Sequence, residues 1–243
     1  MQVTIRNDPT AVARLAADSI ARAVAAQPNL TLGLPTGQTM VSLYAELSSR
    51  HQNGELDLSR VRGFNLDELL LPPGHPSSFR QFMQEHAWEH TGLDPERCDI
   101  PRTKGDPIAE CRRYDKLIEV AGGLDFAILG IGADGHVAYN LPGPIHESTH
   151  IVDVPRVVAK FFEISEDQLP LRAITIGLGP LRSAKSLLML ATGEAKAAAL
   201  VALIEGPQDT RWPCSLLNEH SRFDVVIDAA AASLLHRNGL SVS

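Results

Sequence analysis

Two side chains that can transfer protons, Asp134 and His136, stand two residues apart in a glycine-rich stretch of the sequence. The stretch follows an apolar run over residues 126–129, which is not half-polar as a surface strand would be and so predicts a buried parallel strand. Ligands of open α/β sheets bind beyond the carboxyl ends of the strands, so this carboxylate and imidazole form a candidate acid/base pair. The alternative is a plain strand-to-helix turn, with a capping Asp and a solvated His.

A third titratable side chain, Asp67, follows the apolar run over residues 61–65. It is therefore another carboxylate that falls just past the end of a predicted strand, where sites of α/β proteins are built. An Asp in such a place is more commonly a helix N-cap or a surface turn residue, and that interpretation stays open.

A candidate anion-binding loop follows the apolar strand predicted over residues 30–34, and it ends where a helical pattern resumes at Met40. A loop that opens a helix exposes free backbone N–H groups beside the positive end of the helix dipole, which is how proteins hold phosphates. The loop lacks the Gly and Lys placement of a P-loop and the glycine pattern of a dinucleotide fold, so neither ATP nor NAD is indicated. An ordinary capped turn is the alternative. The loop residues are Pro35, Thr36, Gly37, Gln38 and Thr39.

Strands and helices alternate along the whole chain, without a repeat, a linker or a low-complexity tract. Short apolar runs bounded by turn residues predict strands, and apolar residues at helical spacing predict the helices between them. This order predicts an α/β fold with a single doubly wound, mainly parallel sheet flanked by helices, in one domain over residues 1–243. The predicted strands cover residues 3–5, 30–34, 61–65, 126–129, 173–177, 186–190 and 223–228, with residues 151–158 read as strand or loop.

Composition narrows the class of protein. With 243 residues the chain is long enough for one large core, and its net charge of −7 argues against general nucleic-acid binding. The three cysteines are widely spaced without a CxxC pattern, which suits a reducing compartment and indicates neither a disulfide framework nor a zinc site. The start of the chain has no apolar signal core and no run approaches a membrane span, so we expect a cytoplasmic protein without membrane partners.

Five motifs occur in order along the chain, at residues 32–39 (LGLPTGQT), 64–68 (FNLDE), 75–79 (HPSSF) with Phe82 and Met83, 130–136 (GIGADGH) and 193–196 (GEAK). Together they resemble the superfamily of glucosamine-6-phosphate deaminases and 6-phosphogluconolactonases. Leu69 stands where the lactonases usually carry an Arg after the Asp-Glu pair, so the chain is more similar to the deaminase branch.

The resemblance implies an enzyme and a role for each candidate residue. Asp67 would move a proton between C2 and C1 of an amino-sugar phosphate, turning an aldose into a ketose as ammonia leaves. His136 would open the sugar ring, with Asp134 orienting the imidazole, whose usual pKa near working pH suits this task. The phosphate would lie on the loop at residues 35–39 with Lys196, and Lys160 takes the position of a deaminase Arg. No metal or organic cofactor is implied.

Departures from the family pattern bear on the reaction. Leu141 follows Asn140 where the deaminases have a Glu that assists the catalytic His, and Gln38 stands where the family has Gly. Residues 145–154 lack the basic residues that bind the allosteric effector in regulated deaminases, so we expect no such regulation. The sequence does not decide whether the substrate is glucosamine 6-phosphate or galactosamine 6-phosphate. It also does not decide the oligomeric state, and a homo-oligomer is one of the alternatives.

Two other functions compete with the deaminase. A 6-phosphogluconolactonase would use His136 and the phosphate-binding residues without the proton transfer at C2, and Leu141 is compatible with that reaction. A non-catalytic sugar-phosphate sensor is the other alternative, because similar folds serve as effector domains of transcription regulators. The chain has no basic helix-turn-helix and no spare length for one, which argues against a sensor.

Overall fold

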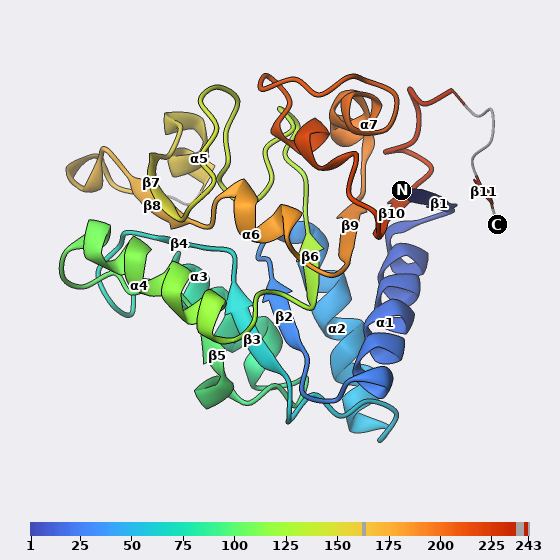
Figure 1. Cartoon of the computed structure of the whole chain (residues 1–243), viewed down its shortest axis with the longest axis horizontal. Helices are drawn as coiled ribbons and strands as arrows, with labels where there is room; N and C mark the ends of the chain where they lie inside the picture. Colours follow the sequence, from blue (N-terminus) through green and yellow to red (C-terminus); the bar gives the residue numbers. More distant parts are fainter. Residues whose placement is uncertain (162–163, 237–240, 243) are drawn as a thin grey trace.

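Eight strands form the central sheet, in the order β11-β1-β10-β9-β6-β2-β3-β5 (Figure 1). The structure is a computed structural model that describes residues 1–161, 164–236 and 241–242. Every strand pair of this sheet is parallel, which confirms the predicted sheet. The strands are β1 (Gln2–Arg6), β2 (Thr31–Leu34), β3 (Arg62–Asn65), β5 (Cys98–Asp99), β6 (Phe126–Leu129), β9 (Leu187–Ala191), β10 (Phe223–Asp228) and β11 (Ser241–Val242).

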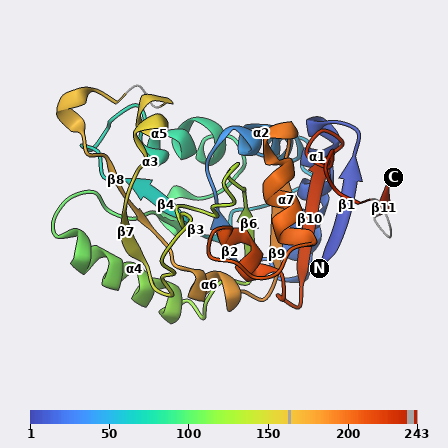
Figure 2. The ribbon, with the colours of Figure 1, turned by 90° about the horizontal axis from the view of Figure 1, so that it is seen from above.

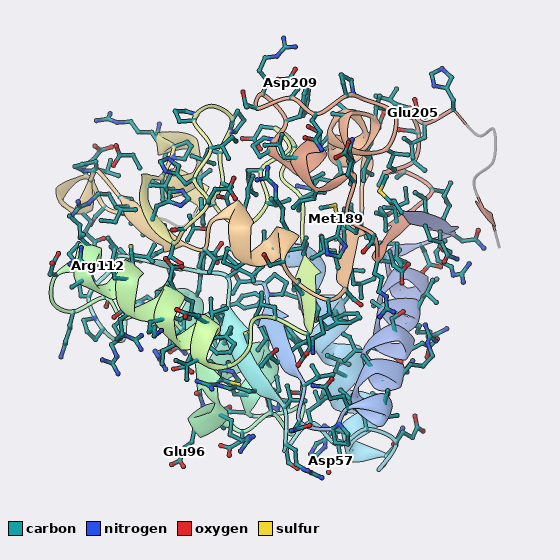
Figure 3. The ribbon with its side chains drawn as sticks, in the orientation of Figure 1. Asp57, Glu96, Arg112, Met189, Glu205 and Asp209 are labelled. Atoms are coloured by element: carbon teal, nitrogen blue, oxygen red, sulfur yellow. The ribbon has the colours of Figure 1, made fainter. Side chains whose placement is uncertain are left out.

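Helices cover both faces of the sheet because successive strand side chains point to opposite sides. On β9, Leu188 and Leu190 belong to one buried cluster, whereas Leu187 and Met189 belong to the other. Figure 3 shows Met189 in the interior, while the labelled Asp57 lies at the periphery. Figure 2 shows α1, α2, α3 and α5 along one side of the strands and α4 and α6 along the other, as expected for a doubly wound fold.

The bounds of the helices agree with their capping signals. Asp8 accepts the Ala11 N–H at 2.8 Å and Pro9 follows it, so α1 begins with an Asp N-cap and a proline in its first turn.

No helix in the described part of the chain is long and apolar enough to span a membrane. The α-helices are α1 (Pro9–Ala26), α2 (Gln38–Gln52), α3 (Phe79–Met83), α4 (Pro107–Val120), α5 (Arg156–Phe161), α6 (Leu178–Arg182) and α7 (Ala197–Ile204).

A second, three-stranded antiparallel sheet stands beside the parallel one. It pairs β4 (Asp67–Leu69) with β8 (Arg172–Thr175), and β8 with β7 (His150–Asp153). A single sheet was predicted, so this second sheet is a difference from the sequence analysis. Its strands are three or four residues long, and their pairing is set by contacts between distant segments rather than by a local pattern. The sheet matters for the site because β4 begins with Asp67.

Short helical turns complete the connections between these elements. Helix α3 runs directly into the π-helical turn η1 (Gln84–Trp88), which widens the helix just where it faces the candidate site. The other turns are 3₁₀ helices: η2 (Pro95–Arg97), η3 (Glu166–Gln168), η4 (Glu194–Lys196) and η5 (Pro213–Leu217).

Candidate active site

A cavity of about 750 Å³ lies at the carboxyl ends of β9, β6, β2 and β3, which are neighbours in the central sheet. Parallel strands end at the same edge, so the loops after these four strands meet there, as expected for an open α/β sheet. The cavity therefore brings together segments that are far apart in the sequence. The candidate residues that line it are Pro35, Thr36, Gly37, Gln38, Thr39, Asp67, His136 and Lys196.

Asp134 and His136 form a hydrogen-bonded pair at the end of β6. The His136 Nδ1 lies 2.6 Å from Asp134 Oδ1, and the same oxygen accepts the His136 N–H at 3.2 Å. The hydrogen bond to His136 holds the pKa of Asp134 below its ordinary value, so this carboxylate stays charged. A charged partner at Nδ1 fixes the imidazole with a proton on Nδ1 and leaves Nε2 free to accept one. The side chain of His136 is 30% exposed, which leaves it accessible.

Two glycines allow this pair to form. A Cβ added at Gly132 would lie 2.2 Å from His136 Nδ1, so no other residue fits beside the imidazole. Gly135 has φ of +81°, and a Cβ there would come within 2.8 Å of the Trp212 ring. The tight turn expected from the glycine-rich sequence thus has a specific purpose, which is to fold Asp134 back onto His136.

Asp67 is a buried carboxylic acid at the start of β4, only 6% exposed but in contact with the cavity. Among the described residues none donates a hydrogen bond to its carboxyl group. Burial, together with the neighbouring charge of Glu68, raises the pKa of Asp67 to about 8. A carboxylate in such surroundings is a much stronger base than one in water, which suits the removal of a weakly acidic proton.

Glu68 ties Asp67 to helix α3. Its carboxylate accepts the N–H groups of Phe79 at 2.7 Å and Arg80 at 2.8 Å, and that of Leu69 at 2.8 Å. Burial raises the pKa of Glu68 to about 6, although these three hydrogen bonds oppose the rise. Glu68 therefore fixes the strand that carries Asp67 against the start of the helix that forms a wall of the cavity.

The loop between β2 and α2 leaves backbone donors free for an anion. Its Gly37 has φ of +110° and, as the N-cap of α2, has no side chain to cap the first N–H groups of that helix. The hydroxyls of Thr39 and Thr192 lie 3.4 Å apart at this end of the cavity. Lys196 lines the same cavity, and burial lowers its pKa from the ordinary value. The combination of helix start, hydroxyls and ammonium suits a phosphate group.

No metal site accompanies these groups in the part of the chain that the structure describes. Its His, Cys, Asp and Glu side chains form no cluster of three or more that could hold a metal ion.

Lys160 is not brought to the cavity. It lies exposed on α5, outside the residues that line the cavity, so its proposed contact with the phosphate stays a prediction. The Phe162 that follows in the same segment lies outside the described residues.

Neither Glu147 nor His146, the polar residues that follow Leu141 most closely and could replace the family Glu, is brought to the cavity. Leu141 packs, partly buried, against the hydrophobic cluster formed with α1 and α2. Glu147 is paired with Arg182 at 2.5 Å, and His146 stacks on His150 with ring centroids 4.1 Å apart.

Other cavity residues were missed by the sequence analysis. Glu85 and His86 reach the cavity from the π-helical turn η1, and Tyr139 reaches it from the loop after His136. The sequence predicts a helix over residues 79–90, but its pattern could not show which side chains face the site, because a π-turn rotates them away from regular helical spacing. Tyr139 had a weak signal in the sequence, since it follows His136 by three residues.

Comparison with known proteins agrees with the motifs. The model of the family "Glucosamine-6-phosphate isomerases/6-phosphogluconolactonase" matches residues 8–227. A glucosamine-6-phosphate deaminase of Hahella chejuensis is 42% identical over 241 residues, covering 97% of this chain and 92% of the relative. Glucosamine-6-phosphate deaminase 2 of Bacillus subtilis is 38% identical over 243 residues, covering 97% of this chain and 98% of the relative.

Solved structures give the same picture of the fold. A monomeric glucosamine-6-phosphate deaminase superposes with a TM-score of 0.90 at 35% identity, covering 96% of this chain and 100% of that one. The 6-phosphogluconolactonase of Trypanosoma cruzi superposes with a TM-score of 0.77 at 18% identity, covering 96% of each chain. The second similarity shows a shared fold alone.

Proposed function

The chain belongs to the family of glucosamine-6-phosphate isomerases and 6-phosphogluconolactonases, and from this membership we propose that it is a glucosamine-6-phosphate deaminase. The reaction converts glucosamine 6-phosphate and water into fructose 6-phosphate and ammonia. One observation carries the proposal. A buried carboxyl group, a carboxylate-oriented imidazole and a phosphate-binding loop share one cavity, in a chain similar to deaminases along nearly its whole length.

The phosphate of the substrate binds at the start of α2. The free N–H groups after Gly37 and the hydroxyls of Thr36 and Thr39 accommodate its oxygens, and Lys196 supplies the positive charge. Binding at this end of the cavity leaves the other end of the sugar facing Asp67 and His136. Lys160 adds a second positive charge only if α5 moves toward the cavity.

Ring opening comes first and uses His136. The Nε2 atom accepts the proton of the hydroxyl on C1 and returns a proton to the ring oxygen as the bond between C1 and that oxygen breaks. The product is an open-chain aldehyde. Asp134 keeps the proton on Nδ1 and stabilises the imidazolium that forms between the two transfers.

Enolisation follows and uses Asp67. Its carboxylate removes the proton from C2, the C1–C2 double bond forms, and negative charge moves onto the oxygen of C1. Asp67 then delivers the proton to C1, while the oxygen on C1 gains a proton and the amino nitrogen loses one, which leaves a hydroxyl on C1 and an imine at C2. Water adds to the imine and ammonia departs, giving the ketone of fructose 6-phosphate. A base with a pKa of about 8 is matched to these transfers near neutral pH.

The lactonase alternative is supported more weakly. Lactone hydrolysis needs a water, a base and a phosphate site, but no proton transfer at C2, so it leaves the buried Asp67 without a task. The lactonases among the similar structures share only 17–21% of their residues with this chain, and they demonstrate the fold alone. The Leu at position 141, where the deaminases have a carboxylate, is the feature in favour of this reaction.

The deciding experiment measures both reactions with the purified protein. We expect ammonia and fructose 6-phosphate in equal amounts from glucosamine 6-phosphate, and no hydrolysis of 6-phosphogluconolactone above its spontaneous rate. Galactosamine 6-phosphate serves as the comparison sugar. Asp67→Asn should abolish ammonia release, whereas Asp57→Asn, a change at an exposed peripheral residue that does not line the cavity, should leave it intact (Figure 3). Lactone hydrolysis without ammonia release would reverse the assignment.

Two properties of the protein in the cell follow from this function. A sugar phosphate is charged and does not cross membranes unaided, so we place the enzyme with its substrate in the cytoplasm. All groups assigned to the reaction come from one chain, so a monomer would suffice for catalysis. Light scattering of the purified protein distinguishes that state from a homo-oligomer.

A further inference from the structure

Tyr139 is a cavity residue whose hydroxyl has no assigned purpose. The side chain is 7% exposed and lines the cavity, and none of the described residues forms a hydrogen bond with its hydroxyl. Among the described residues, Asn65 and Trp88 have side-chain polar atoms that are fully buried and lack a hydrogen-bond partner. The Tyr139 hydroxyl also lacks a partner but is not one of these fully buried atoms, so it is still accessible from the cavity. A buried donor that faces a binding cavity without a protein partner is available to a ligand.

The ring of Tyr139 is parallel to the imidazole of His136. Its centroid is 6.0 Å from that of His136 with 5° between the planes, and 5.9 Å from that of Phe79 with 11° between the planes. The three rings form a column that extends from α3 to the end of β6. The backbone between His136 and Tyr139 passes through a φ of +50° at Ala138, a conformation that non-glycine residues rarely adopt. The chain thus bends sharply at the point that stacks the two rings.

The other side of Tyr139 is fixed to the strand of Asp67. The Tyr139 N–H donates to Thr175 Oγ1 at 3.0 Å, and Thr175 is paired with Asp67 across β8 and β4. Tyr139 and Asp67 line the same cavity. Burial and the charge of Asp67 both raise the pKa of the Tyr139 phenol, which keeps its hydroxyl protonated. Tyr139 therefore connects the two groups that act on neighbouring carbons of the sugar.

We propose that the Tyr139 hydroxyl is a further catalytic group that donates a hydrogen bond to the oxygen on C1 of the substrate during enolisation. This inference rests on the proposed deaminase function and deepens it. When Asp67 removes the C2 proton, negative charge collects on the oxygen of C1, between Asp67 and His136. A donor held at that place stabilises the transition state more than the ground state.

The proposal also bears on Leu141. This side chain can neither donate nor accept a hydrogen bond, so it cannot assist His136 in the way that the resemblance implies for a Glu. The ring of Tyr139, which is parallel to the same imidazole, carries a hydroxyl and so supplies a polar group on this loop that Leu141 does not.

The test compares Tyr139→Phe with the wild type in the deaminase assay. Phenylalanine keeps the ring column and removes only the hydroxyl, which has no partner among the described residues to lose, so Tm should be unchanged. We expect kcat to fall about tenfold with KM changed less than about twofold, the pattern for one lost hydrogen bond made in the transition state. With substrate deuterated at C2, the isotope effect on kcat should equal or exceed that of the wild type, because enolisation is the step that slows.

Two further variants separate the hydroxyl from the ring. Tyr139→Leu removes both and should lower kcat more than Tyr139→Phe does. Tyr114→Phe removes another buried tyrosine hydroxyl, one bonded to the carbonyl groups of Asn65 and Asp99, and should lower Tm but not kcat. Wild-type kcat in Tyr139→Phe, a change in KM alone, or a smaller isotope effect would overturn the inference. A wild type that releases no ammonia would instead refute the proposed function, and this inference with it.

Discussion

The carboxyl groups of Asp67 and Glu68 are adjacent on a buried strand, and the charge of Glu68 contributes to the raised pKa of Asp67. The two side chains have different environments. Asp67 faces the cavity without a hydrogen-bond donor among the described residues, whereas Glu68 accepts three backbone N–H groups, two of them at the start of α3. The same pair thus supplies one reactive and one structural carboxyl group.

Replacing Asp67 by Asn should abolish activity and raise stability at alkaline pH. We expect kcat to fall by about 10³ or more, because the base for the C2 proton is lost. The folded-state pKa of about 8 lies above the ordinary value of 3.8, so the folded protein holds a proton that the unfolded chain releases. The free energy of unfolding therefore decreases as pH rises from about 4 to 8.

The amide of the Asp67→Asn variant cannot ionise, so this variant should escape the loss of stability. At pH of about 8 to 9 we expect it to be more stable than the wild type by about 2 kcal/mol or more, with little difference below pH of about 4. Urea unfolding at a series of pH values measures the difference. Equal pH profiles for both proteins would show that Asp67 is not held neutral in the folded state.

Replacing Glu68 by Gln should lower the pH at which the enzyme becomes active. Loss of the neighbouring negative charge lowers the pKa of Asp67, so the rise of kcat/KM with pH should shift from about 8 to lower values. The amide NH₂ of Gln cannot accept the Arg80 N–H, so stability should fall by about 1–2 kcal/mol. A pH profile with an unchanged midpoint would contradict the coupling between the two carboxyl groups.

Replacing Asp134 by Asn should slow ring opening without weakening substrate binding. The amide cannot hold the charge of the imidazolium and can present an N–H to Nδ1, which favours the wrong tautomer of His136. We expect kcat to fall by about 10²–10³ while KM changes little. The measurement uses substrate that is already in the open-chain aldehyde form. If the variant converts this substrate at the wild-type rate, the defect lies in ring opening.

The sequence predicted the parts of the fold that depend on local patterns. Buried parallel strands appear as uninterrupted apolar runs, so the strands that end at the cavity were predicted at nearly their observed positions, and Asp67 and His136 met there. The antiparallel sheet that begins with Asp67 was not predicted, because its strands are short and its pairing is long-range. The cavity contacts of Glu85 and His86 depend on the π-turn η1, and that of Tyr139 on the φ of Ala138, and no periodicity reveals either.

The two lysines assigned to the phosphate should differ in their effects. Lys196 lines the cavity and is partly buried, so Lys196→Met should raise KM by about 10- to 100-fold, the loss of a charge-assisted contact. Lys160 lies exposed on α5 outside the cavity, so Lys160→Met should raise KM by less than about threefold unless the helix closes over the substrate. Steady-state kinetics on both variants, with Lys116→Met as a surface control on α4, tests this order. Equal increases for the two lysines would indicate that α5 closes on the bound phosphate.

Replacing Leu141 by Glu should not recreate a more active enzyme. Leu141 packs against the hydrophobic cluster, so a carboxylate there would lose apolar contacts and gain no hydrogen-bond donor. We expect a loss of about 1–3 kcal/mol in the free energy of unfolding, and kcat no higher than that of the wild type. Leu141→Met keeps the volume of the side chain and serves as the control, with stability and kcat nearly unchanged.

Leu141→Glu is most informative in the Tyr139→Phe background, where the hydroxyl proposed to act beside His136 is absent. A double variant more active than Tyr139→Phe alone would mean that a carboxylate at position 141 can reach the imidazole, and that Leu141 limits the rate of this enzyme.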